Sequence, residues 1–190
     1  DIAGKISFRN AAVGAIEKFL NREPLGLDAE LSGELDVVAK GDSIAVKGSV
    51  EAPAVKYKGR AVNQAARVEL DVAVDSKAKV ARIARAEAKF GAAVLSASGD
   101  VAYGGDESTA KLRLVSKQSP LVDLRKLVAL SGANPGYETK GVLTADVTAE
   151  GPLSKLAFAG SAAIRGLEVK SKEWKTAVRS PGVEIALTPK

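Results

Sequence analysis

The feature that most constrains the fold of this chain is a period-two alternation of apolar and polar residues. Between residues 68 and 74, every second side chain is Val or Leu, and the side chains between them are Glu, Asp and Ala. Successive side chains of a strand point to opposite faces, so the pattern indicates strands with one apolar and one polar face. The alternation recurs at residues 5–9, 31–37, 44–50, 55–58, 111–114, 143–148 and 183–187.

Short breaks separate these segments, and most of them contain Gly or Pro, as at residues 41–42, 104–106 and 151–152. Connections of this length join antiparallel neighbours, whereas parallel strands need long crossovers. Residues 12–20 and 121–130 instead space their apolar side chains as helices do, and Asn10 is the candidate cap of the first helix. We predict a mainly β fold, an antiparallel meander with two short amphipathic α-helices. Its curved sheet forms either an open groove or a closed barrel or sandwich.

The segment KAKVARIARAEAKF (77–90) combines strong helix formers with a readable period of two. We predict a strand, because a clear strand follows at residues 92–103. The alternation would place Ala84, Ala86 and Phe90 on one face, and Ile83 and Arg85 on the other.

The order of the segments occurs twice along the chain. GELDVVAKG (33–41) resembles GVLTADVTAEG (141–151), and IAVKGS (44–49) resembles LAFAGS (156–161). We predict two imperfect repeat units, 1–106 and 107–190, the second truncated, in one continuous fold.

Missing residue types narrow the chemistry. The 190 residues include no Cys, no His and no Met, which excludes thiolate and imidazole chemistry and suggests an excised piece of a longer protein. The carboxylates Asp71, Asp75, Glu87 and Asp146 fall on polar strand faces, without a pair arranged for acid–base catalysis. We therefore predict a protein that is not an enzyme and needs no cofactor. A carboxylate-dependent hydrolase is an alternative.

The chain has a net charge of +5, and two basic stretches lie at matching places in the two repeats. One interpretation is that these stretches are solvated strand faces. The other is that they contact anionic head groups. Their cations are Lys56, Lys58, Arg60, Lys170, Lys172 and Lys175. Nucleic acid is not an expected partner, because few aromatic residues accompany these cations.

The shared apolar face needs cover, and two short helices are too small for it. If the sheet is open, acyl chains of phospholipid or another lipid are the natural occupants, since burying each methylene is worth about 0.8 kcal/mol. The predicted groove floor includes Ile44, Val46, Leu70, Val72, Leu95, Leu156, Phe158 and Ile164. The Ala and Gly residues of 151–169 would thin and bend the sheet, with a bulge at Gly166.

Three segments carry a resemblance to a known family. GPLSKLAFAGSAAIRGLEV (151–169) resembles the glycine-punctuated strand pair of AsmA-like proteins, and FGAAVLSASGDVAYGG (90–105) resembles their recurring hairpin. KLRLVSKQSPLVDLRKLVALSG (111–132) is similar to the strand-then-helix element of that family's C-terminal region. The resemblance covers most of the chain and rests on glycine spacing and alternation.

The resemblance implies a periplasmic protein of the bacterial envelope, anchored in the inner membrane by an N-terminal helix that this chain lacks. The repeating β-groove of AsmA-like proteins is thought to act in lipid transport and outer-membrane biogenesis, without catalytic residues. We therefore predict a lipid-handling module with possible envelope protein partners. A scaffold module that pairs through its sheet edges is the first alternative.

Overall fold

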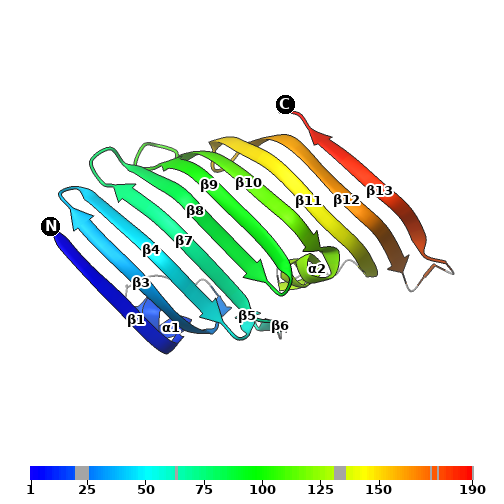
Figure 1. Ribbon diagram of the computed structural model, residues 1–190, viewed down its shortest axis with the longest axis horizontal. Helices are drawn as coiled ribbons and strands as arrows, with labels where there is room; N and C mark the ends of the chain where they lie inside the picture. Colours follow the sequence, from blue (N-terminus) through cyan, green and yellow to red (C-terminus); the bar gives the residue numbers. More distant parts are fainter. Residues whose placement is uncertain (20–25, 63, 131–135, 172, 175, 190) are drawn as a thin grey trace.

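The computed structural model describes residues 1–19, 26–62, 64–130, 136–171, 173–174 and 176–189. Its main element is an open sheet of ten antiparallel strands, in the order β1-β3-β4-β7-β8-β9-β10-β11-β12-β13 (Figure 1). These strands are β1 (Ile2–Ala12), β3 (Glu30–Lys40), β4 (Ser43–Ala52), β7 (Ala66–Asp75), β8 (Val80–Phe90), β9 (Ala93–Ala102), β10 (Thr109–Pro120), β11 (Tyr137–Pro152), β12 (Ala157–Ser171) and β13 (Val178–Leu187). The predicted fold class is confirmed, and the sheet is open rather than closed into a barrel, with β1 and β13 as its edges.

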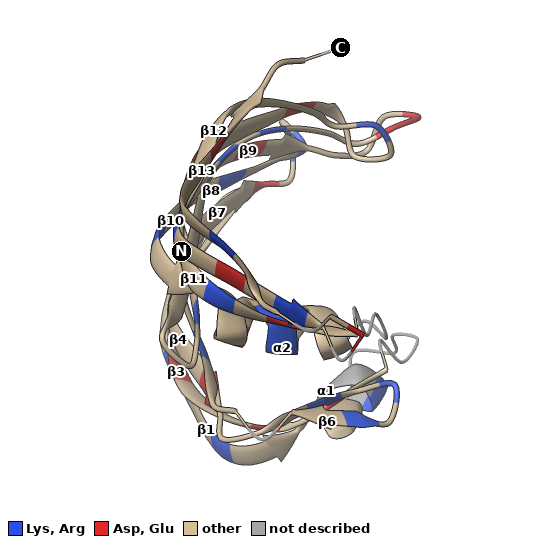
Figure 2. Cartoon of the chain, turned by 90° about the vertical axis from the view of Figure 1, so that its right-hand side faces the viewer, with Lys and Arg blue, Asp and Glu red and all other residues tan. Residues whose placement is uncertain are grey.

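Two helices and a small sheet lie at one end of the long strands, which we call the helix end. The helices are α1 (Val13–Phe19) and α2 (Leu121–Leu130), and the small sheet pairs β2 (Leu27–Asp28), β5 (Val55–Tyr57) and β6 (Arg60–Val62). The long strands curve into a C-shaped profile, and the helices and β6 lie within its concavity (Figure 2). At the other end, the turn end, short loops at 41–42, 76–79, 103–108 and 153–156 join neighbouring strands.

The strand registers join the apolar side chains into continuous rows across the whole sheet. We call the face that carries these rows the inner face. The first row contains Phe8, Gly33, Val50, Val68, Ala88, Leu95, Ser116, Ala145, Ala162 and Ile185. The second row contains Ile6, Leu35, Gly48, Leu70, Ala86, Ala97, Leu114, Val147, Gly160 and Leu187.

A β-bulge in β8 explains why the sequence of 77–90 was ambiguous. Opposite β7, Arg85 pairs with Asp71 and Ile83 pairs with Val72, so Ala84 is an extra residue. The strand was predicted correctly, and Ala86 and Phe90 lie on the face opposite to Arg85 as expected, but the face predicted for Ile83 was wrong. Ile83 and Ala86 both lie on the inner face, because the bulge shifts the alternation by one residue.

Similar irregularities precede both helices. The register of β1 shifts between Phe8 and Ala11, and that of β10 shifts between Lys117 and Ser119. The residues within these shifts, Asn10 and Gln118, have positive φ angles of 50° and 78°. The predicted role of Asn10 as a helix cap is therefore wrong: α1 begins at Val13, and Asn10 belongs to the bulge that turns the chain out of β1.

The predicted bulge at Gly166 is confirmed. The register between β11 and β12 shifts between Lys140 and Val142, opposite Glu168 and Arg165. Gly166 has a φ of 62°, a left-handed conformation that glycine adopts without steric cost. After the bulge, Leu167 and Val169 are half-buried residues of β12.

Candidate functional site

The inner face is the candidate site, because it is apolar along its full width. Two further rows toward the turn end contain only aliphatic residues, phenylalanine and glycine, as in Val46, Val72 and Phe158. Across all four rows, Ser116 is the single polar residue. These four rows therefore contain no charged side chain, and their side chains offer a single hydroxyl for hydrogen bonding.

Seven of the eight residues predicted for the groove floor are on this face. Ile44, Val46, Leu70, Val72, Leu95, Phe158 and Ile164 all occupy inner positions in the registers. Leu156 is the exception in that it precedes β12, in the loop from β11, and has no partner in the register. The registers thus place on one face residues that are more than 100 positions apart in the sequence, such as Ile44 on β4 and Ile164 on β12, although six strand spacings separate these two.

Much of this apolar surface is exposed. Phe158 is 44% exposed and Leu95 37%, although both lie within the sheet and not at its edges. A cleft of about 430 Å³ lies over the centre of the face. Its lining is Val68, Ala86, Ala88, Leu95, Ser96, Ala97, Leu114, Val115, Ser116, Leu143, Ala145, Val147 and Phe158. Soluble proteins seldom leave a contiguous apolar surface of this kind uncovered unless it binds something.

Glycines deepen the floor by separating larger side chains. Gly48 lies between Leu35 and Leu70, and Gly160 lies between Val147 and Leu187. A β-carbon on Gly160 would collide with the carbonyl oxygen of Asp146, so the two strands approach more closely there than a larger residue allows. Gly160 is therefore required by the backbone, and it also leaves space on the inner face.

At the helix end, the inner face is covered. Ala52, Phe90 and Ala93 are inner residues of this end, and each is at most 5% exposed. Ala52 packs with Val13 of α1 and with Ala29, and Leu27, Leu31 and Val55 surround this cluster. The groove is thus closed at the helix end and open along its centre and toward the turn end.

Asp123 fastens α2 to the sheet. Its Oδ2 accepts a hydrogen bond of 2.9 Å from the Ala92 N–H in the β8–β9 turn. Its Oδ1 lies 3.1 Å from the Lys126 ammonium, which also donates to Gln64 Oε1 at 2.7 Å. The Ala92 N–H, and after it the Lys126 ammonium, hold the pKa of Asp123 below its ordinary value, although burial opposes this.

Two serines complete the strand pairing where the bulge of β10 interrupts it. The buried Ser119 hydroxyl accepts from the Val94 N–H and donates to the Val94 carbonyl, both at 3.0 Å. Ser116 donates to Ser119 at 2.8 Å. The one polar residue of the four rows is therefore occupied by structural hydrogen bonds and does not change the apolar character of the floor.

The outer face carries the charges and neutralises them in pairs across neighbouring strands. The Arg113 guanidinium binds both carboxylate oxygens of Asp146, at 2.8 and 2.6 Å. Other cross-strand pairs are Lys5–Glu34, Lys47–Asp71, Arg82–Asp100, Lys140–Glu168 and Arg179–Glu168, at 2.7–3.4 Å. Many of the basic residues of the chain are thus paired with carboxylates on the solvated face of the sheet.

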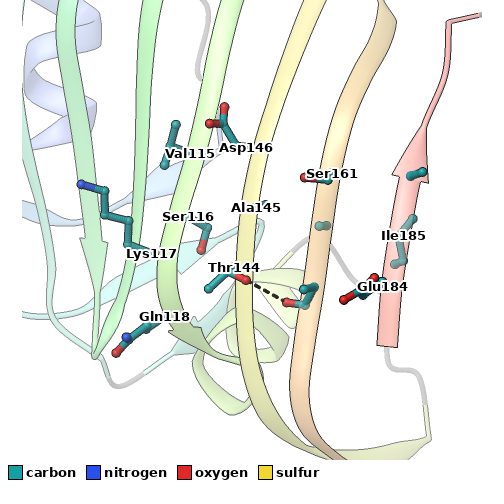
Figure 3. Close-up of a pocket in the computed structure, with 13 residues that line it drawn as sticks. Val115, Ser116, Lys117, Gln118, Thr144, Ala145, Asp146, Ser161, Glu184 and Ile185 are labelled. Atoms are coloured by element: carbon teal, nitrogen blue, oxygen red, sulfur yellow. Dashed lines mark hydrogen bonds between the residues drawn. The ribbon is translucent and has the colours of Figure 1, made fainter. Parts of the chain in front are cut away.

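A second hollow, of about 780 Å³, lies against the outer side of β10 to β13 (Figure 3). Thr144, Asp146 and Ser161 are among its lining residues, and Thr144 donates a hydrogen bond to the Ala163 carbonyl. The hollow exists because β12 has only Ala and Ser at its outer positions from 157 to 163. Its polar groups are spread over four strands and do not converge on one point.

The carboxylates considered for catalysis all have hydrogen-bond or ion-pair partners. Asp71 pairs with Lys47, and Asp75 accepts hydrogen bonds from the N–H groups of Lys77 and Ala78. Hydrogen bonds from arginines lower the pKa of Glu87 and of Asp146. A general acid requires the opposite shift. No cluster of acidic residues that could hold a metal ion occurs within the described residues.

The predicted head-group contacts lie at the helix end, in part outside the described residues. Lys56, Lys58 and Arg60 are exposed on the small sheet, where Lys56 lies 3.6 Å from Asp28 and the Lys58 ammonium lies 5.3 Å from the Tyr57 ring centre. Lys170 is exposed near the same end of β12. Lys172 and Lys175 are not among the described residues.

Sequence reasoning missed several of these features. The alternation at 55–58 predicted a strand there, but not its pairing with Leu27–Asp28 in a separate small sheet. The hydrogen bonds of Asp123 with Ala92 and of Ser119 with Val94 also join segments far apart in the chain, and the local sequence carries no signal for such contacts. Neither helix of the described residues has the length and apolar composition that a membrane-spanning helix needs.

Comparison of the chain with known protein families, with curated proteins and with solved structures gives no match.

Proposed function

We propose that this protein is a non-enzymatic module that holds the acyl chains of phospholipid or another lipid against the inner face of its sheet. The observation that supports this most strongly is the apolar surface itself, which is continuous over ten strands and includes exposed large side chains such as Phe158 and Leu95. Acyl chains match a surface that has shape and hydrophobicity but almost no polar groups.

The energetics favour such an occupant. Each buried methylene contributes about 0.8 kcal/mol, so about ten of them contribute roughly 8 kcal/mol before the entropic cost of binding is subtracted. The floor offers its ligand almost no polar side chain to bind, because the Ser116 hydroxyl is hydrogen-bonded to Ser119 within the protein. The site therefore selects for acyl chains as a class and not for one lipid.

The two ends of the groove differ, which suggests an orientation for the lipid. The acyl chains lie over the centre of the inner face, and the helix end carries the exposed cations Lys58 and Arg60 beside the covered region. An anionic or zwitterionic head group at this end gains electrostatic attraction while its chains remain on the apolar floor.

The resemblance to AsmA-like proteins adds a proposal about the cellular location of this protein. In that setting the module lies in the periplasm, belongs to a protein anchored in the inner membrane by a segment outside this chain, and serves lipid transport in outer-membrane biogenesis. The fold is compatible with this proposal, because an open groove lets a lipid enter and leave without unfolding the sheet.

Native mass spectrometry tests the function. Protein purified without detergent should carry additional mass equal to that of phospholipid or fatty acid, and solvent extraction should release it. Protein that is free of lipid and also fails to take up a fluorescent fatty acid would show that the proposal is wrong.

A matched pair of variants locates the site. Leu114 and Arg113 are neighbours on β10 that face opposite sides of the sheet. Leu114→Gln should reduce uptake of the fluorescent fatty acid, whereas Arg113→Gln should leave it nearly unchanged. Equal effects of both variants would place the ligand elsewhere, and circular dichroism verifies that each variant is folded.

A further inference from the structure

The two edges of the main sheet, β1 and β13, match each other as neighbouring strands do. Every pair of neighbours in the ten-stranded sheet is antiparallel, so the first and last strands run in opposite directions. A second copy placed beside the first by simple translation would therefore bring its β1 antiparallel to β13. The even number of strands thus satisfies the direction that antiparallel pairing requires.

The rows of side chains also match at the two edges. One inner row begins at Phe8 on β1 and ends at Ile185 on β13, and the next begins at Ile6 and ends at Leu187. If these rows continue into a second copy, Ile185 lies opposite Phe8, and Leu187 lies opposite Ile6. A single register thus extends both apolar rows, and a slip by one residue would turn β1 over.

The same register pairs two opposite charges. One outer row begins at Ser7 and ends at Ala186. Two residues further toward the helix end, β1 carries Arg9 and β13 carries Glu184, and both side chains are exposed. Alignment of Ser7 with Ala186 therefore sets Arg9 of one copy opposite Glu184 of the next. The edges are complementary in charge as well as in apolar pattern.

The edges also expose apolar surface that this pairing would cover. Ile6 is 53% exposed and Ile185 is 43% exposed, so both edges present large apolar side chains to solvent. Pro181, which has no N–H, limits the usable edge of β13 to its turn-end half. This half, residues 184–187, faces residues 6–9 in the matching register.

From these observations we propose that copies of this chain associate head to tail, with β13 of one copy pairing antiparallel to β1 of the next in the register that sets Glu184 opposite Arg9. The occupant of each edge is a second copy of this chain. The contact is heterologous, so it leaves one free edge at each end and can repeat. This inference goes beyond the proposed function and does not require that lipid is bound.

Cysteine cross-linking tests the register directly, because the natural chain contains no cysteine. Nine strand spacings of about 4.8 Å place Ser7 and Ala186 of one copy on the order of 40 Å apart, too far for a disulfide within one copy. A double variant with Ser7→Cys and Ala186→Cys should form a ladder of dimers and larger oligomers on mild oxidation. Absence of this ladder would overturn the proposal.

The double variant Ser7→Cys with Glu184→Cys is the register control. Its two cysteines are displaced by two residues, about 7 Å along the strand, and should cross-link at least about fivefold less. Equal cross-linking of the two variants would indicate random collision and would also overturn the proposal.

Charge reversal tests the pair in the unmodified backbone. Analytical ultracentrifugation over a range of concentrations should show weaker association of Arg9→Glu and of Glu184→Arg, by about tenfold each. The double variant should recover to within about threefold of the natural chain. Lys117→Glu, an exposed reversal in an interior strand, should have little effect.

A natural chain that stays monomeric at all concentrations, or charge variants that associate like the natural chain, would contradict the edge pairing. A protein that carries lipid but stays monomeric refutes only this inference. A lipid-free protein that forms the ladder refutes only the proposed function.

Discussion

Gly48 and Gly160 have the same relationship to the strand that precedes each of them. Gly48 lies opposite Leu35 and Gly160 lies opposite Val147, and in each case a β-carbon would collide with the carbonyl oxygen of the residue before that partner. Both glycines have a positive φ, 156° and 134°. They belong to segments that the sequence matches, IAVKGS and LAFAGS, so a shared backbone geometry accompanies the shared sequence.

This geometry predicts that Gly160 does not accept a side chain. Gly160→Ala should lower the free energy of unfolding by about 1–3 kcal/mol, because the strand must shift or adopt a strained φ. The control is Gly182→Ala on β13, where the nearest atom to an added β-carbon is the Ile164 carbonyl oxygen at 3.8 Å. Urea denaturation measures both, and an equal loss for the two variants would contradict the close approach at Gly160.

The hydrogen bond between Asp123 of α2 and the Ala92 N–H, which we call the latch, predicts that the free energy of unfolding depends on pH. Because the pKa of Asp123 is lowered in the folded state, its contribution is fully present above the carboxyl pKa of the unfolded chain. The contribution is lost as the pH falls through the lower folded value. Asp123→Asn should lower the free energy of unfolding by about 1–3 kcal/mol at pH 7, from the loss of buried hydrogen bonds to a charged group.

The same variant should differ less from the natural chain in acid, once the natural carboxyl is protonated. Chemical denaturation at pH 7 and near pH 3 measures this difference. A deficit that does not change with pH would indicate that the carboxylate charge has no part in the latch.

Glu168 makes a second electrostatic prediction, on the outer face. Hydrogen bonds from Arg179 at 2.7 Å and from Lys140 at 3.0 Å lower the pKa of Glu168 to about 2. A titration followed by NMR should find this low value, and Arg179→Gln should raise it toward the ordinary glutamate range. A Glu168 that titrates normally in the natural chain would show that the two cations do not hold it in solution.

The cations of the small sheet predict a preference for anionic membranes. A variant with Lys56→Ser, Lys58→Ser and Arg60→Ser should bind anionic liposomes more weakly than the natural chain does, by up to about a hundredfold if each cation contributes about 1 kcal/mol near the surface. The control removes three cations of the outer face by Lys5→Ser, Lys47→Ser and Lys111→Ser. Co-sedimentation with liposomes compares the two variants. An equal loss of binding in both would show that net charge, and not the position of the small-sheet cations, determines binding.

Much of the sheet could be predicted from the sequence, because alternation is a local signal and the strands have one apolar face each. The face of Ile83 in β8 could not, since the bulge at Ala84 is fixed by its register with β7 and β9. The prediction of Asn10 as a helix cap was wrong for the same reason. Asn10 belongs to a bulge opposite Ser32, and its N–H donates a hydrogen bond to the Ser32 hydroxyl at 3.1 Å. The sequence around Asn10 does not reveal this partner, which lies 22 residues away.

The floor of the candidate site was predictable to the same extent as the strand faces, and Ile44, Phe158 and Ile164 lie where the alternation placed them. Whether the floor is open depends on whether β1 meets β13, and a pattern along one strand carries no information on that. The cover of the inner face at the helix end could not be predicted from the sequence either, because Asp123 and Ser119 form hydrogen bonds with residues of distant turns and strands.

Photo-cross-linking can show whether lipid lies on the inner face, because it reports which face of the sheet the lipid touches. The protein is incubated with a fatty acid that carries a diazirine near the end of its chain, irradiated and digested, and the modified residues are identified by mass spectrometry. We expect adducts on inner residues such as Leu95, Leu114 and Val147, and competition by unlabelled phospholipid. Adducts on the outer face alone, or spread equally over both faces, would show that the inner face does not hold the lipid.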